Sequence, residues 1–121
     1  MYGHEGIKEL RATLIAGEEN MIAYPDAYMP EGLIKAYNVA YYRKSWKVRR
    51  IRISSVTGLH PNVNRYDAIN IIDAILDGSF RYERPKVVQF EGRRYIVDGH
   101  HRIYIARELG KEWVEVDYKV L

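Results

Sequence analysis

The segment 114–120 alternates apolar and charged residues with a strict period of two, and this pattern constrains the fold more than any other. The apolar positions are Val114, Val116, Tyr118 and Val120, and the charged positions are Glu115, Asp117 and Lys119. Successive side chains of a β-strand point to opposite faces, so the pattern predicts a strand with one buried face. Such a strand needs a layer of helices or a second sheet against that face. A chain of 121 residues has the length of one domain that can bury this core.

Helical and strand patterns along the rest of the chain predict a mixed α+β domain. Apolar residues at helical spacing predict helices near 5–16, 31–45, 64–78 and 100–110. Strands are predicted over 48–56, 86–90 and 93–97, with Glu91-Gly92 as the turn of a hairpin, and residues 18–30 are predicted to be irregular. We expect a small mixed sheet with flanking helices, in a core domain over 47–121 that follows an N-terminal helical extension over 1–46.

Composition excludes several classes of site. The chain has no cysteine, which excludes disulfides, thiolate zinc sites, iron–sulfur clusters and cysteine nucleophiles. No apolar run approaches the ~20 residues of a membrane-spanning helix, so no membrane partner is expected. The first residues lack the basic and then apolar pattern of a signal peptide, and we therefore expect a cytoplasmic protein.

The net charge of +3 comes from a single basic segment, residues 43–52, which has six bases and no acid. The bases are Arg43, Lys44, Lys47, Arg49, Arg50 and Arg52. Clustered cations beside Trp46 are typical of a surface that binds DNA. Two structural alternatives remain open: the arginines cover the solvent face of an edge strand, where charge deters strand pairing, or they neutralise acids of the extension.

An apolar strand over 95–97 runs through Asp98-Gly99 directly into a helix, and this junction is the best candidate for a functional site. The first N–H groups of a helix and its dipole favour an anion. Gly99 permits a close approach of a ligand to the backbone, and Arg102 in the first turn can donate to phosphate oxygens. The structural alternative is that Asp98 caps the helix while Arg102 pairs with a nearby carboxylate.

The residues of this junction also resemble a known family. Val97-Asp98-Gly99-His100-His101-Arg102, followed by Ile105-Ala106 and Leu109-Gly110, resembles the signature of the ParB/sulfiredoxin superfamily. The resemblance covers roughly residues 48–120 and implies that the Gly-x-x-Arg turn holds nucleotide phosphates. Sulfiredoxins carry cysteine where this chain has His100, which excludes their thiol chemistry. Chromosome-partitioning members carry Gly-Glu-Arg-Arg at the turn and further domains for which this chain has no room.

Within that superfamily, the turn looks most like that of the archaeal free-serine kinases. The resemblance implies that Asp98 helps to hold Mg²⁺ and that Gly99, His100, His101 and Arg102 hold the phosphates of ATP, ADP or CTP. Those kinases place a catalytic glutamate in the loop before the preceding helix, where this chain has His60 and no carboxylate until Asp67. The catalytic candidates are therefore Asp98, His100, His101 and His60, with one of the histidines as the general acid or base.

Three functional hypotheses follow. The first is a Mg²⁺-dependent phosphotransferase or phosphohydrolase that acts on a nucleotide and, for a transferase, on a small hydroxyl-bearing acceptor. The second is a DNA-binding or DNA-cleaving module that grips the backbone through residues 43–52, with Asp98 and His101 acting with a metal. A domain that binds a nucleotide without turnover is a third possibility.

Overall fold

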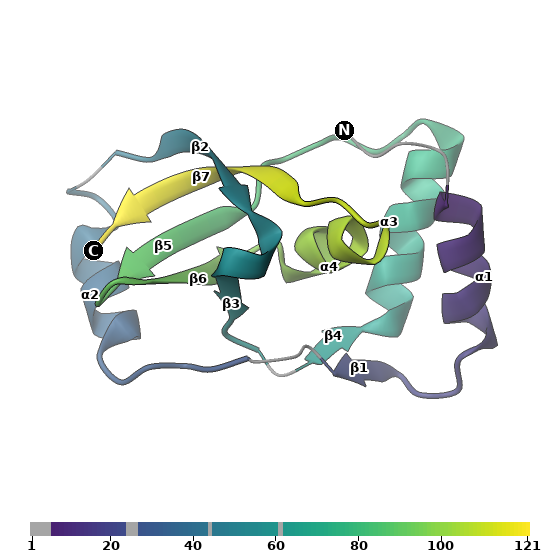
Figure 1. Ribbon diagram of the computed structural model, residues 1–121, viewed down its shortest axis with the longest axis horizontal. Coiled ribbons are helices and arrows are strands. Elements are labelled where there is room, and N and C mark those ends of the chain that lie inside the picture. Colours follow the sequence, from purple (N-terminus) through teal and green to yellow (C-terminus); the bar gives the residue numbers. More distant parts are fainter. Residues whose placement is uncertain (1–5, 24–26, 44, 61) are drawn as a thin grey trace.

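The computed structural model describes residues 6–23, 27–43, 45–60 and 62–121, and its centre is a five-stranded sheet (Figure 1). Across the sheet the strands are β2 (Lys47–Arg52), β7 (Trp113–Val120), β5 (Lys86–Phe90), β6 (Arg93–Asp98) and β3 (Val56–Gly58). The pairs β2–β7 and β5–β6 are antiparallel, whereas β5–β7 and β3–β6 are parallel. The predicted α+β class with a small mixed sheet is therefore confirmed.

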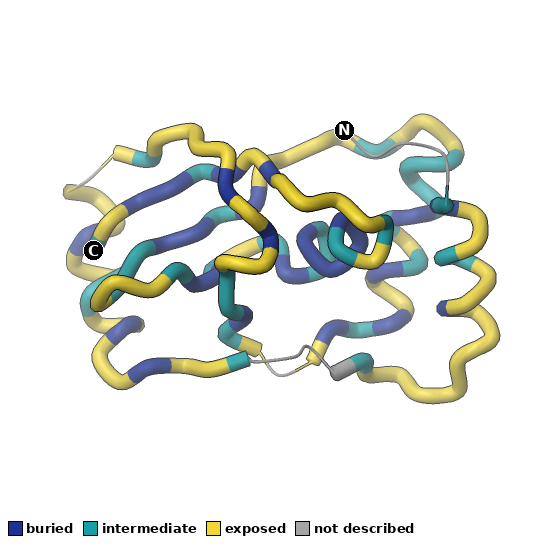
Figure 2. The backbone as a smooth tube through the Cα atoms, in the orientation of Figure 1, coloured by how far each residue is buried: buried dark blue, intermediate teal, exposed yellow. Residues whose placement is uncertain are grey.

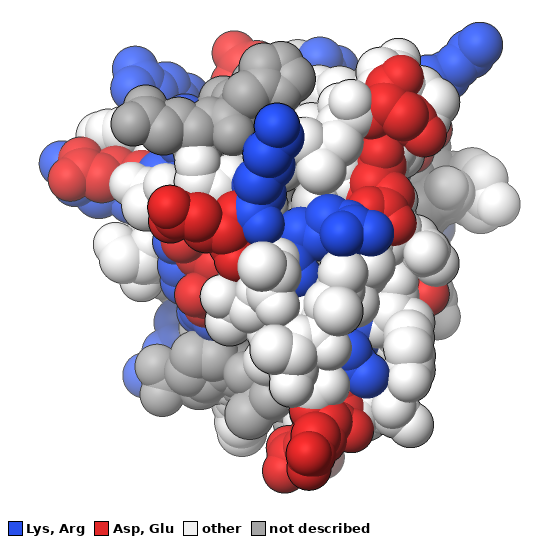
Figure 3. Space-filling view, turned by 90° about the vertical axis from the view of Figure 1, so that its right-hand side faces the viewer, with Lys and Arg blue, Asp and Glu red and all other residues white. Residues whose placement is uncertain are grey.

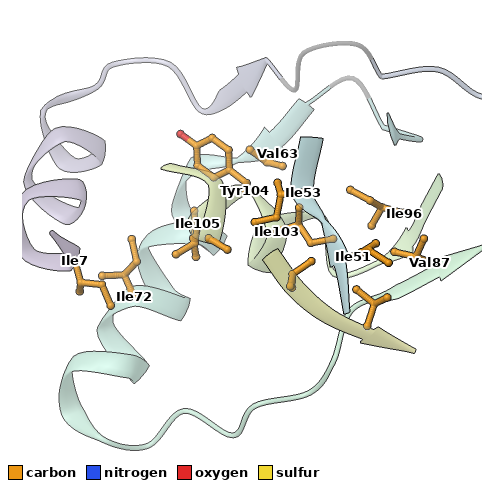
Figure 4. Packing of buried hydrophobic residues seen from close by; sticks show 14 of the residues in the cluster. Ile7, Ile51, Ile53, Val63, Ile72, Val87, Ile96, Ile103, Tyr104 and Ile105 are labelled. Carbon is orange, nitrogen blue, oxygen red and sulfur yellow. The ribbon is translucent and has the colours of Figure 1, made fainter. Parts of the chain in front are cut away.

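The main hydrophobic core lies between one face of this sheet and two helices. The helices of the molecule are α1 (Ile7–Ala16), α2 (Leu33–Ala40), α3 (Arg65–Asp77) and α4 (His100–Glu108). Val87 and Ile96 of the sheet share a buried cluster with Ile103 of α4 and Ile72 of α3 (Figure 4). Ile7 of α1 packs beside Ile72, so α1 forms an outer layer on α3. Figure 2 shows that burial is concentrated in α4 and the strands, while long stretches of α1 are exposed.

The opposite face of the sheet carries a second, smaller core beneath α2. Val88 and Tyr95 alternate along their strands with Val87 and Ile96, so their side chains lie on the other face. They form a buried cluster with Leu33, the first residue of α2. Helices therefore cover both faces of the sheet, and each strand of the hairpin is buried on both sides. No helix among the described residues is long and apolar enough to cross a membrane.

Lys119 departs from the alternation expected for the last strand. The pattern predicts an exposed Lys119 and a buried Val120, but Lys119 is 2% exposed and Val120 is 48% exposed. The Lys119 ammonium group donates to the carbonyl oxygens of Ala40 (3.3 Å) and Tyr41 (3.0 Å) at the end of α2 and lies 4.3 Å from the centre of the Trp46 ring. A buried ammonium group needs such partners, and the last carbonyls of a helix favour a cation. Because α2 covers this face, the lysine is buried there.

The sheet is strongly curled, with the Tyr118 side chain on its concave face. Strands β2 and β3 are its two edges, yet only three residues, 53–55, separate them in the sequence. The step from Arg52 to Val56 spans at most about 14 Å, whereas five flat strands would be about 19 Å wide. The connecting segment therefore crosses over one face, visible in Figure 1 as the ribbon from β2 to β3. Ser55 in this segment accepts a hydrogen bond from Arg94, which marks the crossed face as that of Arg94.

Local signals in the sequence explain several boundaries. The Asn64 side chain accepts a hydrogen bond from the Asp67 N–H (3.1 Å) and caps α3, which ends at Gly78 as predicted. Glu91 and Gly92 have positive φ angles of 52° and 79°, which suit the tight turn between β5 and β6. Helix α1 and the hairpin strands also lie within a few residues of their predicted ranges.

Three predicted segments differ from the structure. Residues 18–30, predicted as irregular, contain β1 (Met21–Ala23), which pairs with β4 (Asn62–Asn64) in a separate two-stranded sheet. The strand predicted over 48–56 is interrupted by a 3₁₀ turn at Ile53–Ser55, because the chain must cross the curled sheet there. The helix predicted over 31–45 is limited to α2, with a turn over 41–43 after it.

Candidate functional site

The junction between β6 and α4 has the predicted strand–turn–helix geometry. Strand β6 ends at Asp98, Gly99 follows with φ 93°, and α4 begins at His100. The N-cap position is thus Gly99. The alternative that the Asp98 side chain caps α4 is therefore wrong. Asp98 is exposed, and its carboxylate lies 3.6 Å from the Arg102 guanidinium one turn later. The first N–H groups of α4 point away from the helix at this end, beside Asp98 and Arg102.

Gly99 is needed at this position because of Pro85. A Cβ at position 99 would lie 2.8 Å from the Pro85 Cβ and 3.0 Å from its Cα, closer than packed atoms tolerate. The positive φ disfavours a side chain independently of that contact. Gly99 therefore allows Pro85, in the segment before β5, to lie close to the backbone. The close approach of a ligand to Gly99 stays a prediction.

Arg102 is mostly buried and has partners supplied by the protein. Its side chain is 14% exposed, and Nη1 donates a short hydrogen bond to the Glu83 carbonyl oxygen. The Glu83 carboxylate lies 4.0 Å from Nη1, and the Asp98 carboxylate lies on the side of Nη2. A cation in the first turn of a helix is unfavourable unless an anion is near. Here Asp98 and Glu83 are such anions. The structure therefore contains the pairing of Arg102 with a nearby carboxylate that was the alternative to a phosphate ligand.

His100 anchors the start of α4 to the loop after β3. Its side chain is buried, and Nε2 accepts a hydrogen bond from the Leu59 N–H at 3.0 Å. Since Nε2 accepts, the neutral ring carries its proton on Nδ1. Burial lowers the pKa of His100 to about 4, and the nearby His60 and His101 lower this pKa further. His100 is therefore neutral at pH 7.

His101 makes an equivalent contact with the segment before α3. Its Nε2 accepts from the Asn64 N–H at 3.1 Å and lies 3.9 Å from an Asp67 carboxylate oxygen. Burial lowers the pKa of His101, although Asp67 acts in the opposite direction. The two adjacent histidines thus fasten α4 to two different loops, and the Nε2 lone pair of each ring is occupied by a backbone N–H.

His60 differs from the other two histidines in being exposed. Its ring centre lies 4.7 Å from that of His100, with an angle of 46° between the ring planes. The structure therefore brings together His60 and His100 of the four catalytic candidates, and Asp98 with Arg102 of the phosphate candidates. Sequence reasoning missed the backbone partners Glu83, Leu59 and Asn64, since no side-chain pattern marks a carbonyl or an N–H as a partner.

The described residues hold no cluster of three or more His, Cys, Asp or Glu side chains that could bind a metal ion. Asp98 is a single, exposed carboxylate. Magnesium is often held by one or two carboxylates together with phosphate oxygens of the substrate. The residues present fit that arrangement, in which Asp98 is one ligand of Mg²⁺ and phosphate oxygens of the nucleotide are others.

The basic segment lies largely on β2, at an edge of the sheet, which agrees with the edge-strand alternative. Lys47, Arg49, Arg50 and Arg52 are exposed on β2, Arg43 is exposed in the turn after α2, and Lys44 is outside the described residues. Alternation divides the β2 side chains between both faces. Arg50 and Arg52 lie 4.9 and 4.5 Å from the centre of the Trp113 ring, whereas Arg49 lies 4.8 Å from that of Tyr118.

Comparison with known proteins gives one similar structure. No protein-family model and no curated protein match the chain. The crystal structure of sulfiredoxin from Arabidopsis thaliana is similar, with a TM-score of 0.49 and 13% identity, over 62% of this chain and 86% of that chain. A likeness at this identity and TM-score assigns neither an activity nor a residue role to this chain, and the resemblance to serine kinases stays a prediction.

Proposed function

We propose that the chain binds the phosphate groups of a nucleotide at the start of α4, and that it transfers a phosphoryl group to a hydroxyl-bearing acceptor or to water. One observation carries the proposal: α4 starts directly after β6 at Gly99, with Arg102 in its first turn and the exposed Asp98 beside it. The helix dipole, the first N–H groups and a guanidinium group all favour a phosphate at this point.

Arg102 is the residue expected to respond most directly to a ligand. Its guanidinium is held by the Glu83 carbonyl and lies 3.6 Å from Asp98. A phosphate carries more charge than one carboxylate and offers several acceptor oxygens, so it can replace Asp98 as the partner of Nη2. Asp98 then becomes available for Mg²⁺, and this coupling makes metal binding depend on the nucleotide.

Asp98 is the residue that would hold Mg²⁺, together with phosphate oxygens. A bound Mg²⁺ neutralises charge that develops on the phosphate oxygens during transfer. The protein contributes the position of the phosphate, through the α4 N–H groups and Arg102. Because the described residues offer no larger ligand cluster, we expect no tight Mg²⁺ binding without a nucleotide.

Among the histidines, His60 is the best candidate for the general base. His100 and His101 each use Nε2 to accept from a backbone N–H, and the lowered pKa values keep both neutral at pH 7. We assign them the role of positioning α4. His60 is exposed beside His100 and can take the proton of an acceptor hydroxyl or of water as the new P–O bond forms and the bond to the leaving phosphate breaks.

The test is nucleotide binding by Arg102→Ala and by a matched control. Arg84→Ala removes the same charge from an exposed arginine that pairs with Asp117 at 2.8 Å. Isothermal titration with ATP, ADP and CTP, each with and without Mg²⁺, is expected to show at least a tenfold loss of affinity for Arg102→Ala and little change for Arg84→Ala. Unchanged binding of all three nucleotides by Arg102→Ala would refute the assignment.

Product analysis then separates the possible reactions. Incubation of a bound nucleotide with Mg²⁺ and serine, followed by mass spectrometry, distinguishes phosphoserine from released inorganic phosphate. His60→Gln is expected to abolish either product while leaving nucleotide affinity within about twofold, because His60 is assigned to proton transfer only. A domain that binds without turnover would yield neither product from the unmodified chain.

A further inference from the structure

The concave face of the sheet has two different ends. At one end, α4 fills it with apolar side chains such as Ile103. The other end is marked by the Tyr118 ring, with the Arg49 guanidinium carbon 4.8 Å and the Arg94 guanidinium carbon 5.5 Å from its centre. These two cations come from β2 and β6, strands that are separated in the sheet by β7 and β5. The curvature of the sheet therefore brings both guanidinium groups to the same ring.

The polar partners at this end are neutral. Arg94 donates through Nε to the Tyr118 hydroxyl (3.2 Å) and through Nη1 to the Ser55 hydroxyl (3.1 Å). The Tyr118 hydroxyl in turn donates to the Gln89 side-chain oxygen at 2.6 Å. These bonds fix the Arg94 guanidinium in place, and both partners are neutral hydroxyl groups.

No carboxylate in the described part of the chain forms an ion pair with these cations. Across the part of the chain that the structure describes, Arg49 and Arg94 form no ion pair, whereas Arg11, Arg84 and Arg102 each pair with an acid. Asp98 follows a register shift in β6 that pairs it with Lys86, and it lies four residues beyond Arg94, about 13 Å away. Two like charges beside one ring repel each other, and an anion between or above them removes that repulsion.

The surface around these residues is hollowed in two places. A shallow pocket next to Tyr118 is lined by Ser55, Thr57, Gln89, Gly92, Arg93 and Arg94. A second hollow, lined by both polar and apolar residues, includes Lys47, Arg49 and Tyr118. Lys47 and Arg49 alternate with Val48 on β2, so they share the concave face and lie about 7 Å apart along the strand.

The other face of β2 is different in charge and contacts. Arg50 and Arg52 lie against Trp113, and Arg50 is directly opposite Glu115 in the pairing of β2 with β7. Opposite charges on facing strands compensate each other. The α1–α3 end of the molecule, seen in Figure 3, also carries basic and acidic groups side by side. Among these surfaces, the Tyr118 end of the concave face is the one with cations from two strands and neutral partners only.

We propose that Lys47, Arg49 and Arg94 form a binding site for the phosphodiester backbone of a nucleic acid, separate from the site at the start of α4. The Arg49 and Arg94 guanidinium carbons are no more than about 10 Å apart, since both lie close to one ring. With Lys47 they form a row of cations, which complements a row of phosphates along a strand better than one small anion. Tyr118 is buried and offers no stacking platform, so binding tolerates any base sequence.

The test compares two charge-matched double variants. Fluorescence anisotropy with a fluorescein-labelled 15-base-pair DNA duplex, at 50 to 200 mM NaCl, measures affinity and its salt dependence. Arg49→Gln/Arg94→Gln is expected to weaken binding at least tenfold and to reduce the slope of log K against log salt by about two, one for each phosphate contact. Arg50→Gln/Arg52→Gln, with the same change in charge on the same sheet, is expected to change affinity less than threefold.

Several outcomes overturn the proposal: no salt-dependent binding by the unmodified chain, equal losses in both double variants, or displacement of the duplex by inorganic phosphate at the concentration of duplex phosphate. The last would show a pocket for a single anion. Arg49→Gln alone guards against a folding defect, because the Arg49 side chain is exposed and makes no hydrogen bond to another described residue. It is expected to weaken binding at least threefold with an unchanged thermal midpoint, and an unchanged affinity overturns the proposal.

Discussion

The start of α4 and the Tyr118 end of the concave face each contain a fixed arginine, but they differ in how its charge is balanced. Arg102 lies beside the carboxylates of Asp98 and Glu83. Arg94 is held by the hydroxyl groups of Tyr118 and Ser55. Both side chains have a defined geometry, and among the described residues only Arg102 has carboxylates beside it.

For the two proposed sites, the difference predicts two modes of anion binding. At the proposed site at the start of α4, a phosphate would have to displace Asp98 from Arg102, so binding there would be an exchange of partners. At the Tyr118 end a phosphate adds a counter-charge where the described residues supply none. The first mode favours selectivity, because only a ligand stronger than a carboxylate can compete. The second favours affinity that depends on salt.

The start of α4 is tightly packed against Pro85, and Gly99→Ala is the substitution expected to disturb it most. The new Cβ would lie 2.8 Å from the Pro85 Cβ, at a φ of 93° that disfavours a side chain. We expect a loss of about 3 kcal/mol in the free energy of unfolding, from overpacking and the left-handed backbone together. Urea denaturation followed by circular dichroism measures this loss.

Gly110→Ala is the matched control for that substitution. Gly110 also has a positive φ, of 78°, but nothing lies within 4 Å of a Cβ there. We expect a loss of about 1 kcal/mol, from the backbone conformation alone. Equal losses for the two variants would show that the contact with Pro85 contributes nothing and that the start of α4 can relax.

A second prediction uses the protonation of His100. Its pKa is about 4 in the folded chain, below the ordinary value of 6.5 that applies when the chain is unfolded. Between these values the unfolded state binds a proton that the folded state does not, so stability falls as the pH falls from 6.5 to 4. His100→Gln keeps a hydrogen-bond acceptor for the Leu59 N–H and removes the imidazole that takes up a proton in this pH range. Relative to this variant, the unmodified chain should lose about 2 kcal/mol between pH 7 and pH 4.5.

Parallel stability curves for the two proteins would contradict this assignment of His100. His101 is present in both, and its own lowered pKa therefore cancels in the comparison. The carboxylates that titrate near pH 4 cancel in the same way. The difference between the curves isolates the burial of one imidazole at the start of α4.

The smallest expected effects come from the two arginine environments themselves. Arg102→Gln should lower the free energy of unfolding by about 1 kcal/mol, since it removes the hydrogen bond to Glu83 and the contact with Asp98. Arg49→Gln should change stability by less than about 0.5 kcal/mol in either direction. Thermal denaturation at low and high salt distinguishes the two variants. Salt screens the contact of Arg102 with Asp98, so it should reduce the difference in stability between Arg102→Gln and Arg49→Gln. A larger loss of stability for Arg49→Gln than for Arg102→Gln would show that Arg49, and not Arg102, has the stabilising partners.

Much of the fold was predictable because the decisive signals are local. The cap at Asn64, the turn at Glu91-Gly92 and the junction at Asp98-Gly99 each depend on residues within a few positions. The same locality made the start of α4 identifiable as a candidate site from the sequence. Its partners were not identifiable, because the Leu59 and Asn64 N–H groups and the Glu83 carbonyl are backbone groups without a sequence signature.

The remaining features depend on contacts between distant segments. Strand β1 is three residues long and is defined by its pairing with β4, some forty residues away. Lys119 is buried because α2 covers that face, and nothing near position 119 in the sequence predicts this. The convergence of Arg49 and Arg94 on Tyr118 follows from the curvature of the sheet, which the composition of its strands does not determine.

The position of β7 between β2 and β5 has a consequence for how the chain folds. β7 is the last strand in the sequence, yet it joins the edge strand β2 to the hairpin of β5 and β6. Until residues 113–120 leave the ribosome, β2 has no neighbour in the sheet on the side where it later pairs. The nascent chain therefore carries β2 as an unpaired strand until β7 has been synthesised. The exposed arginines of β2 deter its pairing with other chains during that time.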